Sequence, residues 1–178
     1  MRKPRTGFSL VELLVTLAVA VILVTAATPS LLQFVRTNRL AAASNELVAA
    51  LQFARAEALR RGRPVGVCAS GDQSTCNAGG DWSGGWIVFQ DAVVSGAPAP
   101  TATGAELVRV WQRLDGFTLG GQVAWLRFLP DGSVDWPAGG SGVERYFDLR
   151  PQACVGDGDR RIHVGRLGRV RTEKRACG

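Results

Sequence analysis

The chain has 178 residues, of which 46% are hydrophobic and 20% are charged; this composition excludes a largely disordered chain and suits one domain with at most one appended element. Its 22 Gly and 8 Pro favour a body of turns and short strands. The formal net charge of +6 is uneven: residues 1–7 carry +3, residues 8–153 carry −1 and residues 154–178 carry +4. The two basic ends therefore call for separate explanations.

An apolar run from Phe8 to Thr28 follows the basic N-terminus. As a helix it is about 31 Å long, which matches a hydrocarbon core of roughly 30 Å. The preceding cations predict a cytoplasmic N-terminus and an exported C-terminus. A cleaved secretory signal, with VTAA at residues 24–27 as its cleavage site, is the alternative. Against it, the run is longer than the apolar part of such signals and contains Glu12, an acid that needs a partner in a membrane.

The stretch GFSLVE, residues 7–12, resembles the leader junction of type IV pilins and pseudopilins. The resemblance implies that residues 1–7 are a prepilin leader, that a prepilin peptidase cleaves after Gly7, and that Phe8 becomes an N-methylated first residue. It also implies that Glu12 pairs with the terminal amine of a neighbouring pilin subunit during assembly. The protein would thus be held in the inner membrane until its acid is neutralised between chains.

Beyond Pro29 the sequence turns amphipathic instead of ending the helix. Apolar residues recur at helical spacing at Leu47, Leu51, Ala54 and Ala58, with Val48 and Leu59 alongside. Gly62 and Pro64 then supply a stop. We therefore expect one helix from Phe8 to about Arg61, roughly 80 Å long. Residues 8–28 would form its transmembrane and assembly half, and residues 29–61 an amphipathic half that packs on a sheet.

Residues 62–178 carry the pattern of a small β domain. Its strand-length runs are rich in Val, Ile, Phe and Trp: PVGVCA, GWIVFQD, ELVRVWQR, VAWLRFLP, VERYFDL and RRIHVGR. LPDGSV, residues 129–134, predicts a hairpin turn, and GAPAPTATG, residues 96–104, an exposed loop. The expected fold is α+β, with the long N-terminal helix packed on an antiparallel sheet of six or seven strands, as in type IV pilins of the GspH/FimT type.

Four cysteines in an exported domain favour disulfides over metal binding, and the chain has no C-x-x-C pair. Three pairings are possible. We expect Cys68 to pair with Cys76 across a short loop, and Cys154 with Cys177, which would immobilise the basic tail. A loop of that second size contributes on the order of 3 kcal/mol in the chain-entropy treatment.

The basic tail predicts a site for a polyanion. RRIHVGRLGRVRTEKR reads as a strand, a turn around Leu167 and Gly168, and a return strand. Arg169 and Arg171 would project from the same face about 7 Å apart, close to the spacing of successive phosphates on one nucleic-acid strand. Guanidinium groups offer forked donors suited to phosphate oxygens. The candidate DNA-binding residues are Arg160, Arg161, Arg166, Gly168, Arg169, Arg171, Lys174 and Arg175.

GRVR, residues 168–171, resembles the GRxR motif near the C-terminus of FimT-type minor pilins. In that family the motif binds DNA, without regard to sequence, during uptake by type IV pili in natural transformation. The resemblance covers the leader, the helix, the GspH/FimT-like β domain and the tail. Two alternatives stay open: a GspH-type pseudopilin of type II secretion with no DNA-binding role, and a solvated basic hairpin that only protects a sheet edge.

The sequence predicts neither an enzyme nor a cofactor site. His163 is the only histidine and lies within an expected strand, where a structural or surface role is favoured, and no catalytic set can be built around it. GDGD, residues 156–159, carries too few acids for calcium and reads as a turn. We expect most of the five Trp to be core or turn residues rather than platforms for bases.

Overall fold

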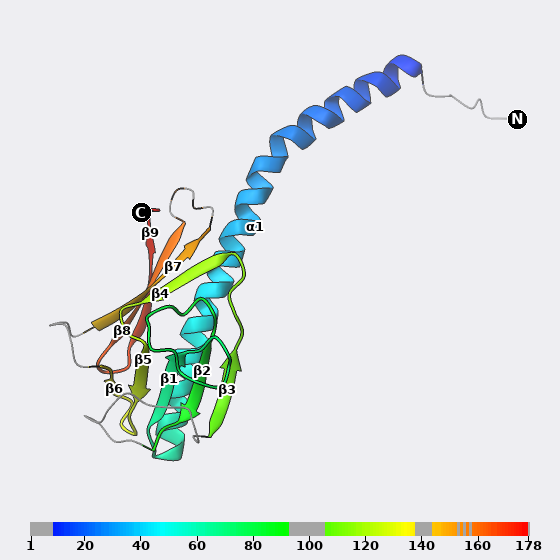
Figure 1. The fold of residues 1–178 in the computed structure, drawn as a ribbon. Helices are drawn as coiled ribbons and strands as arrows, with labels where there is room; N and C mark the ends of the chain where they lie inside the picture. The colour runs from blue at the N-terminus through cyan, green and yellow to red at the C-terminus, as the bar shows by residue number, and fades with distance from the viewer. Residues whose placement is uncertain are drawn as a thin grey trace, which may run out of the picture. The chain divides into compact units, whose positions relative to one another are not determined.

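The computed structural model describes residues 9–92, 106–137, 144–152, 154, 156 and 158–177, without the side chains of residues 26–30. Within these residues the chain forms one helix, α1 (Leu10–Arg61), followed by nine strands (Figure 1). It divides into two compact units, Met1–Arg39 and Leu40–Gly178. Each unit is described by itself.

The first unit consists of the N-terminal part of α1, which continues through Pro29 without interruption, as predicted. Its described side chains are exposed, including Leu13, Leu17, Ile22 and Phe34. Among the described residues, no helix combines the length and the apolar character that crossing a membrane requires. The leader residues and the predicted cleavage site at Gly7 and Phe8 lie outside the described residues.

In the second unit α1 supplies one wall of the core. Ala, Leu, Gln, Glu and Arg, which are strong helix formers, dominate residues 40–61. The predicted apolar face is confirmed, because Leu47, Leu51, Ala54 and Ala58 are fully buried. Leu59 is an exception: its prediction as part of this face was wrong, since the side chain is 51% exposed. The helix ends where predicted, at Gly62, whose φ of 63° lies in the left-handed region that favours glycine.

The nine strands form two antiparallel sheets (Figure 1). Sheet A has the order β3-β2-β1-β5-β6. Its members are β1 (Val65–Ala69), β2 (Trp86–Gln90), β3 (Leu107–Trp111), β5 (Trp125–Phe128) and β6 (Val134–Asp135). Sheet B has the order β4-β7-β8-β9. Its members are β4 (Phe117–Gly121), β7 (Glu144–Pro151), β8 (Asp159–Gly165) and β9 (Val170–Arg175).

The core lies where both sheets meet the C-terminal part of α1. Sheet B faces it with alternate residues, and Phe147, Leu149, Ile162 and Val164 are fully buried. Trp82 packs edge-on against Phe147 with 4.9 Å between ring centroids. As expected, Trp side chains serve mainly as core: four are buried, Trp82, Trp86, Trp125 and Trp136.

The predicted α+β fold and its strand-length runs are confirmed, and the hairpin turn at Pro130–Gly132 joins β5 to β6. Strand β4 was not predicted, because its Gly-ending sequence FTLGG has no strand signature. The partner strand that the predicted hairpin requires is present as the two-residue β6. The expected loop at residues 96–104 lies outside the described residues.

Candidate nucleic-acid interface

The hairpin of β8 and β9 carries the basic tail. The two strands pair from Asp159 opposite Arg175 to Val164 opposite Val170. At the turn, the Gly165 amide donates to the Arg169 carbonyl at 2.9 Å, and the Gly168 amide donates to the Gly165 carbonyl at 2.9 Å. Gly168 has a φ of 75°, a backbone conformation that strains other residues. The turn predicted around residues 167 and 168 is therefore present.

The tip of this hairpin is fixed to two other elements. The Arg55 guanidinium, on α1, donates to the carbonyls of Gly132 and Leu167, both at 3.1 Å. The Val134 amide donates to the Arg166 carbonyl at 2.8 Å. A Cβ at Gly168 would collide with the carbonyl oxygen of Gly132 and crowd Arg55. Gly168 thus has a packing role as well as a conformational one, and the anchoring role of Arg55 had no signal in the sequence.

A disulfide fixes the base of the hairpin. Cys154 and Cys177 are bonded, with their Cα atoms 5.8 Å apart, and the Cys177 amide donates to the Gly156 carbonyl at 3.0 Å. The other predicted bridge, Cys68–Cys76, is also present, with a Cα separation of 5.5 Å. Asp159 lies beside Cys154 and Cys177, but both sulfurs are engaged in the disulfide and unavailable to a metal.

Four cations of the hairpin are exposed and form no ion pair with any residue that the structure describes: Arg166, Arg169, Lys174 and Arg175. They gather at two places. Arg166 and Arg169 flank the tip, whereas Lys174 and Arg175 end β9 near the disulfide, about 20 Å away at the usual strand rise. The Arg166 guanidinium lies 4.6 Å from the centroid of the Trp136 ring, a contact that limits its motion while leaving its charge intact.

Two of the predicted contact residues, Arg160 and Arg161, have their guanidinium groups engaged within the protein. Arg160 is only 7% exposed, because its position in β8 points to the core face, where its guanidinium donates to the Asp159 carbonyl at 3.0 Å. Arg161 is held by two hydrogen bonds to Asp148, at 2.6 and 2.8 Å, and lies 3.8 Å from the Tyr146 ring centroid. Burial raises the pKa of Asp148, but the hydrogen bonds and charge of Arg161, together with the charges of Arg150 and Arg175, outweigh it, and the pKa is lowered.

Arg171 is partly exposed and partly engaged in ion pairs, and so differs both from the exposed cations of the hairpin and from Arg160 and Arg161. Val170 packs toward the core, and Arg171 emerges on the outer face of sheet B with a side chain 46% exposed. Its guanidinium meets Glu144 at 3.1 Å and Glu173 at 3.9 Å. The hydrogen bond from Arg171 is the main cause that lowers the pKa of Glu144. His163 lies between the same two acids, at 3.4 and 3.1 Å, with its side chain 12% exposed, in a mid-strand position where a structural or surface role was predicted.

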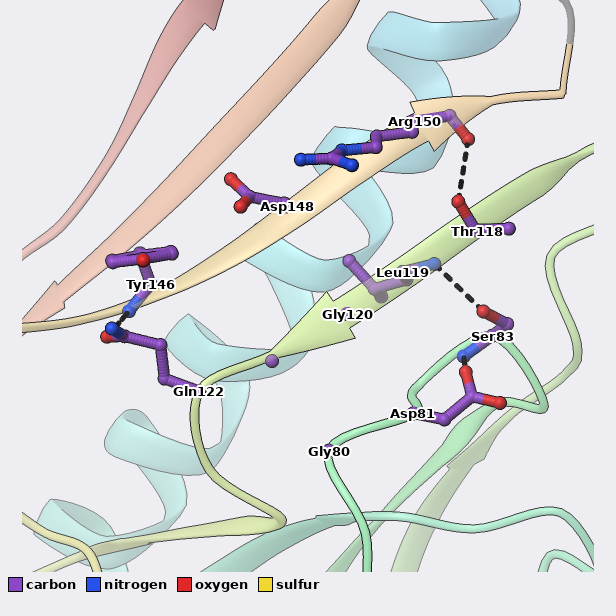
Figure 2. Close-up of a pocket in the computed structure, with 11 residues that line it drawn as sticks. Gly80, Asp81, Ser83, Thr118, Leu119, Gly120, Gln122, Tyr146, Asp148 and Arg150 are labelled. Atoms are coloured by element: carbon purple, nitrogen blue, oxygen red, sulfur yellow. Dashed lines mark hydrogen bonds between the residues drawn. The ribbon is translucent and has the colours of Figure 1, made fainter. Parts of the chain in front are cut away.

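A separate hollow of about 580 Å³ opens on the outer face of sheet B, and Figure 2 shows its lining. Strands β4 and β7 form one side, with Thr118, Tyr146 and Arg150 pointing away from the strands, and Gly80, Asp81 and Ser83 form the other. Gly120, on its floor, has neither a positive φ nor any atom within 4 Å of a Cβ placed there. The hollow contains none of the predicted contact residues.

The hairpin, anchored at its tip and at its base, can therefore present four to five cations to a polyanion.

Comparison with known protein families identifies the family to which this fold belongs. A family described as type II transport protein GspH matches residues 43–168. This chain belongs to the GspH family.

A second family match supports the N-terminal assignment. The prokaryotic N-terminal methylation motif matches residues 2–28 of this GspH-family protein. Glu12 lies in the first turn of α1 and is exposed, and its acid therefore remains accessible to another chain. Family membership and this motif together identify a type IV minor pilin of the GspH/FimT kind.

Solved structures agree with the family match. Two crystal forms of the type IV minor pilin FimU from Pseudomonas aeruginosa are similar to this GspH-family chain. The P21 form is 27% identical with a TM-score of 0.55 and covers 79% of this chain and 92% of its own. The P65 form is 26% identical with a TM-score of 0.50 and covers 74% and 90%. A search of curated proteins finds no match.

Proposed function

We propose that this minor pilin binds DNA through the outward cations of its β8–β9 hairpin and supports DNA uptake in natural transformation. One observation carries the proposal: Arg166, Arg169, Lys174 and Arg175 are exposed, without an ion pair among the described residues, on a hairpin anchored at both ends. Because the backbone that bears these cations is already held in place, binding a polyanion costs little ordering of the main chain.

The contact is made to phosphates and is indifferent to sequence. Neutralising about four phosphates gives a slope near −3.6 in log affinity against log salt for duplex DNA, with a dissociation constant of roughly 10⁻⁴ to 10⁻⁶ M. Arg171 contributes less than its exposure suggests, since Glu144 competes with phosphate for its guanidinium. Weak binding by one subunit suffices where several contacts to the same DNA add avidity.

The N-terminal residues support a role for this activity on a filament. Cleavage by prepilin peptidase after Gly7 leaves a methylated Phe8, and Glu12 then pairs with the terminal amine of a neighbouring subunit. Before assembly, residues 8–28 hold the protein in the inner membrane as a single span, with its C-terminal domain in the periplasm. After assembly, the hairpin is carried on the pilus to the surface of a Gram-negative cell.

The test is a DNA titration with the full-length protein in nonionic detergent at two salt concentrations. Changing both Arg169 and Arg171 to Gln is expected to weaken binding at least tenfold and to reduce the salt slope by about one to two. The control replaces Arg63 and Arg113, which are exposed away from the hairpin, and changes the net charge equally. Equal binding by both double variants contradicts the proposed site.

The second candidate function is that of a GspH-type pseudopilin of type II secretion, favoured by the matching family, which is described as type II transport protein GspH. It makes the opposite prediction in the same titration, because a secretion pseudopilin needs no affinity for nucleic acid. Absence of binding by the parent protein at low salt selects this alternative.

A further inference from the structure

Leu167, at the tip of the β8–β9 hairpin, is the most exposed large apolar side chain described in the unit Leu40–Gly178. It is 81% exposed, against 51% for Leu59 and 42% for Leu107. Exposed apolar residues are ordinary on surfaces. A tight turn, however, is where Asn, Asp, Ser or Gly would serve the backbone better. The conformation of the turn therefore does not explain why a leucine occupies this position.

Packing does not explain this leucine either, because only the backbone of Leu167 is used by the fold. Its carbonyl accepts a hydrogen bond from Arg55 at 3.1 Å, and the neighbouring Arg166 carbonyl accepts one from Val134 at 2.8 Å. Gly168, on the other side, packs against Gly132. The main chain on both sides of the leucine is thus fixed, while its side chain is directed into solvent.

Two cations that form no ion pair with the described part of the chain flank this side chain. Arg166 precedes it and lies against the Trp136 ring, and Arg169 follows it by two residues; both are exposed. The tip thus presents an apolar side chain on a fixed backbone, with a cationic residue on each side of it in the sequence. Proteins that bend DNA use this combination, inserting apolar side chains between base pairs from the minor groove while cations occupy the groove.

We propose that Leu167 enters the minor groove of duplex DNA and partly separates two adjacent base pairs, with Arg166 and Arg169 on the flanking phosphates. This inference rests on the proposed function and adds the form of the ligand, which is double-stranded. Single strands are held chiefly by aromatic platforms, and Trp136, the ring that Arg166 contacts, is 4% exposed and covered by Arg166 and Arg145. Because the minor groove is only about 6 Å wide, the leucine side chain, rather than the two-stranded ribbon, is the part that enters it.

Insertion makes binding sensitive to how readily a base step opens. Pyrimidine–purine steps such as TA unstack more easily than the steps of a stiff A-tract. A duplex with a central TA step should therefore bind a few times more tightly than an A-tract of equal length and charge. Phosphate contacts alone would not separate these two ligands.

The experiment uses full-length protein in nonionic detergent and a short duplex with 2-aminopurine beside a TA step. The parent protein should raise the 2-aminopurine fluorescence as it binds. Leu167→Ala should bind the duplex about tenfold more weakly, remove the fluorescence rise, and leave the salt slope and single-strand affinity unchanged. Leu107→Ala, an exposed leucine on sheet A, is the matched control and should behave as the parent.

The outcomes separate this proposal from the one on which it rests. If the parent binds DNA and Leu167→Ala binds with the same affinity and fluorescence rise, the wedge is refuted while DNA binding stands. A uniform loss on duplex and single strand, or a shallower salt slope, also refutes the wedge, since the substitution then acts on the cations. No binding by the parent protein at low salt refutes both.

Discussion

Glu144 controls how much of the Arg171 charge reaches a ligand. The two side chains meet at 3.1 Å and are each about half exposed, and water therefore weakens the pair without abolishing it. Glu144→Gln should tighten DNA binding about two- to threefold at low salt and steepen the salt slope by up to about one. The control is Glu106→Gln, which removes the same charge from a pair with Arg61. Equal effects of the two substitutions would show that only net charge matters.

Gly168 is required by both conformation and space, whereas Gly120 is required by neither. Gly168→Ala should lower the free energy of unfolding by about 1–2 kcal/mol, because it places a Cβ in the left-handed region and against the Gly132 carbonyl. It should also weaken DNA binding by displacing the tip. Gly120→Ala should be neutral in thermal unfolding and in DNA titration. A neutral Gly168→Ala would mean that the turn can relax away from Gly132.

At the scale of elements, the Cys154–Cys177 disulfide, at the end of β9, should contribute more to DNA affinity than the Cys68–Cys76 disulfide. Replacing Cys154 and Cys177 by Ser should cost about 3 kcal/mol of stability and release the end of β9 that bears Lys174 and Arg175. Chemical denaturation and DNA titration measure the two effects. The Cys68–Cys76 bridge closes a separation of 8 residues on another sheet, and its removal should leave DNA affinity unchanged. Equal losses of affinity would refute this division of roles.

The C-terminal end of α1 contains ion pairs of Glu57 whose stabilising effect depends on pH. Glu57 accepts hydrogen bonds from Arg60 and Arg61, which lower its pKa from 4.5 to about 2. Because the folded pKa is below the unfolded one, the stabilisation is present above pH 4.5 and is lost as pH falls toward 2. Glu57→Gln should therefore flatten the fall in melting temperature across this window. Glu46→Gln, elsewhere on α1, should leave the fall as steep as in the parent.

The elements also show where sequence reasoning succeeds. Strands with a run of Val, Ile, Phe and Trp, such as β2 and β5, can be predicted from their composition. Strand β4 cannot, because FTLGG ends in two glycines, and its place is set by pairing with β7, far along the chain. Prediction of the candidate site from the sequence is limited in the same way. The sequence shows that Arg160 and Arg161 are cations, but only the register of β8 against β7 directs one side chain to the core and the other to Asp148.

At the scale of the whole molecule, the two units differ in what they need from other chains. Every buried core residue described lies in Leu40–Gly178, whereas the described apolar side chains of the first unit, such as Leu13 and Phe34, are exposed. A helix that is apolar on all sides is stable only when lipid or other proteins cover it. This division suits a subunit whose first unit joins a filament while its second presents a surface.

The second unit should therefore fold without the first. A segment of residues 36–178 retains the whole described core and both disulfides, and it should unfold in one cooperative transition by calorimetry. Since all the hairpin cations belong to this unit, its DNA affinity per molecule should match that of the full-length protein in detergent within about twofold. The comparison is made at one salt concentration with DNA in trace amounts, so that avidity in micelles does not enter. Aggregation of the segment, or an affinity more than tenfold weaker, would mean that the first unit takes part in folding or in binding.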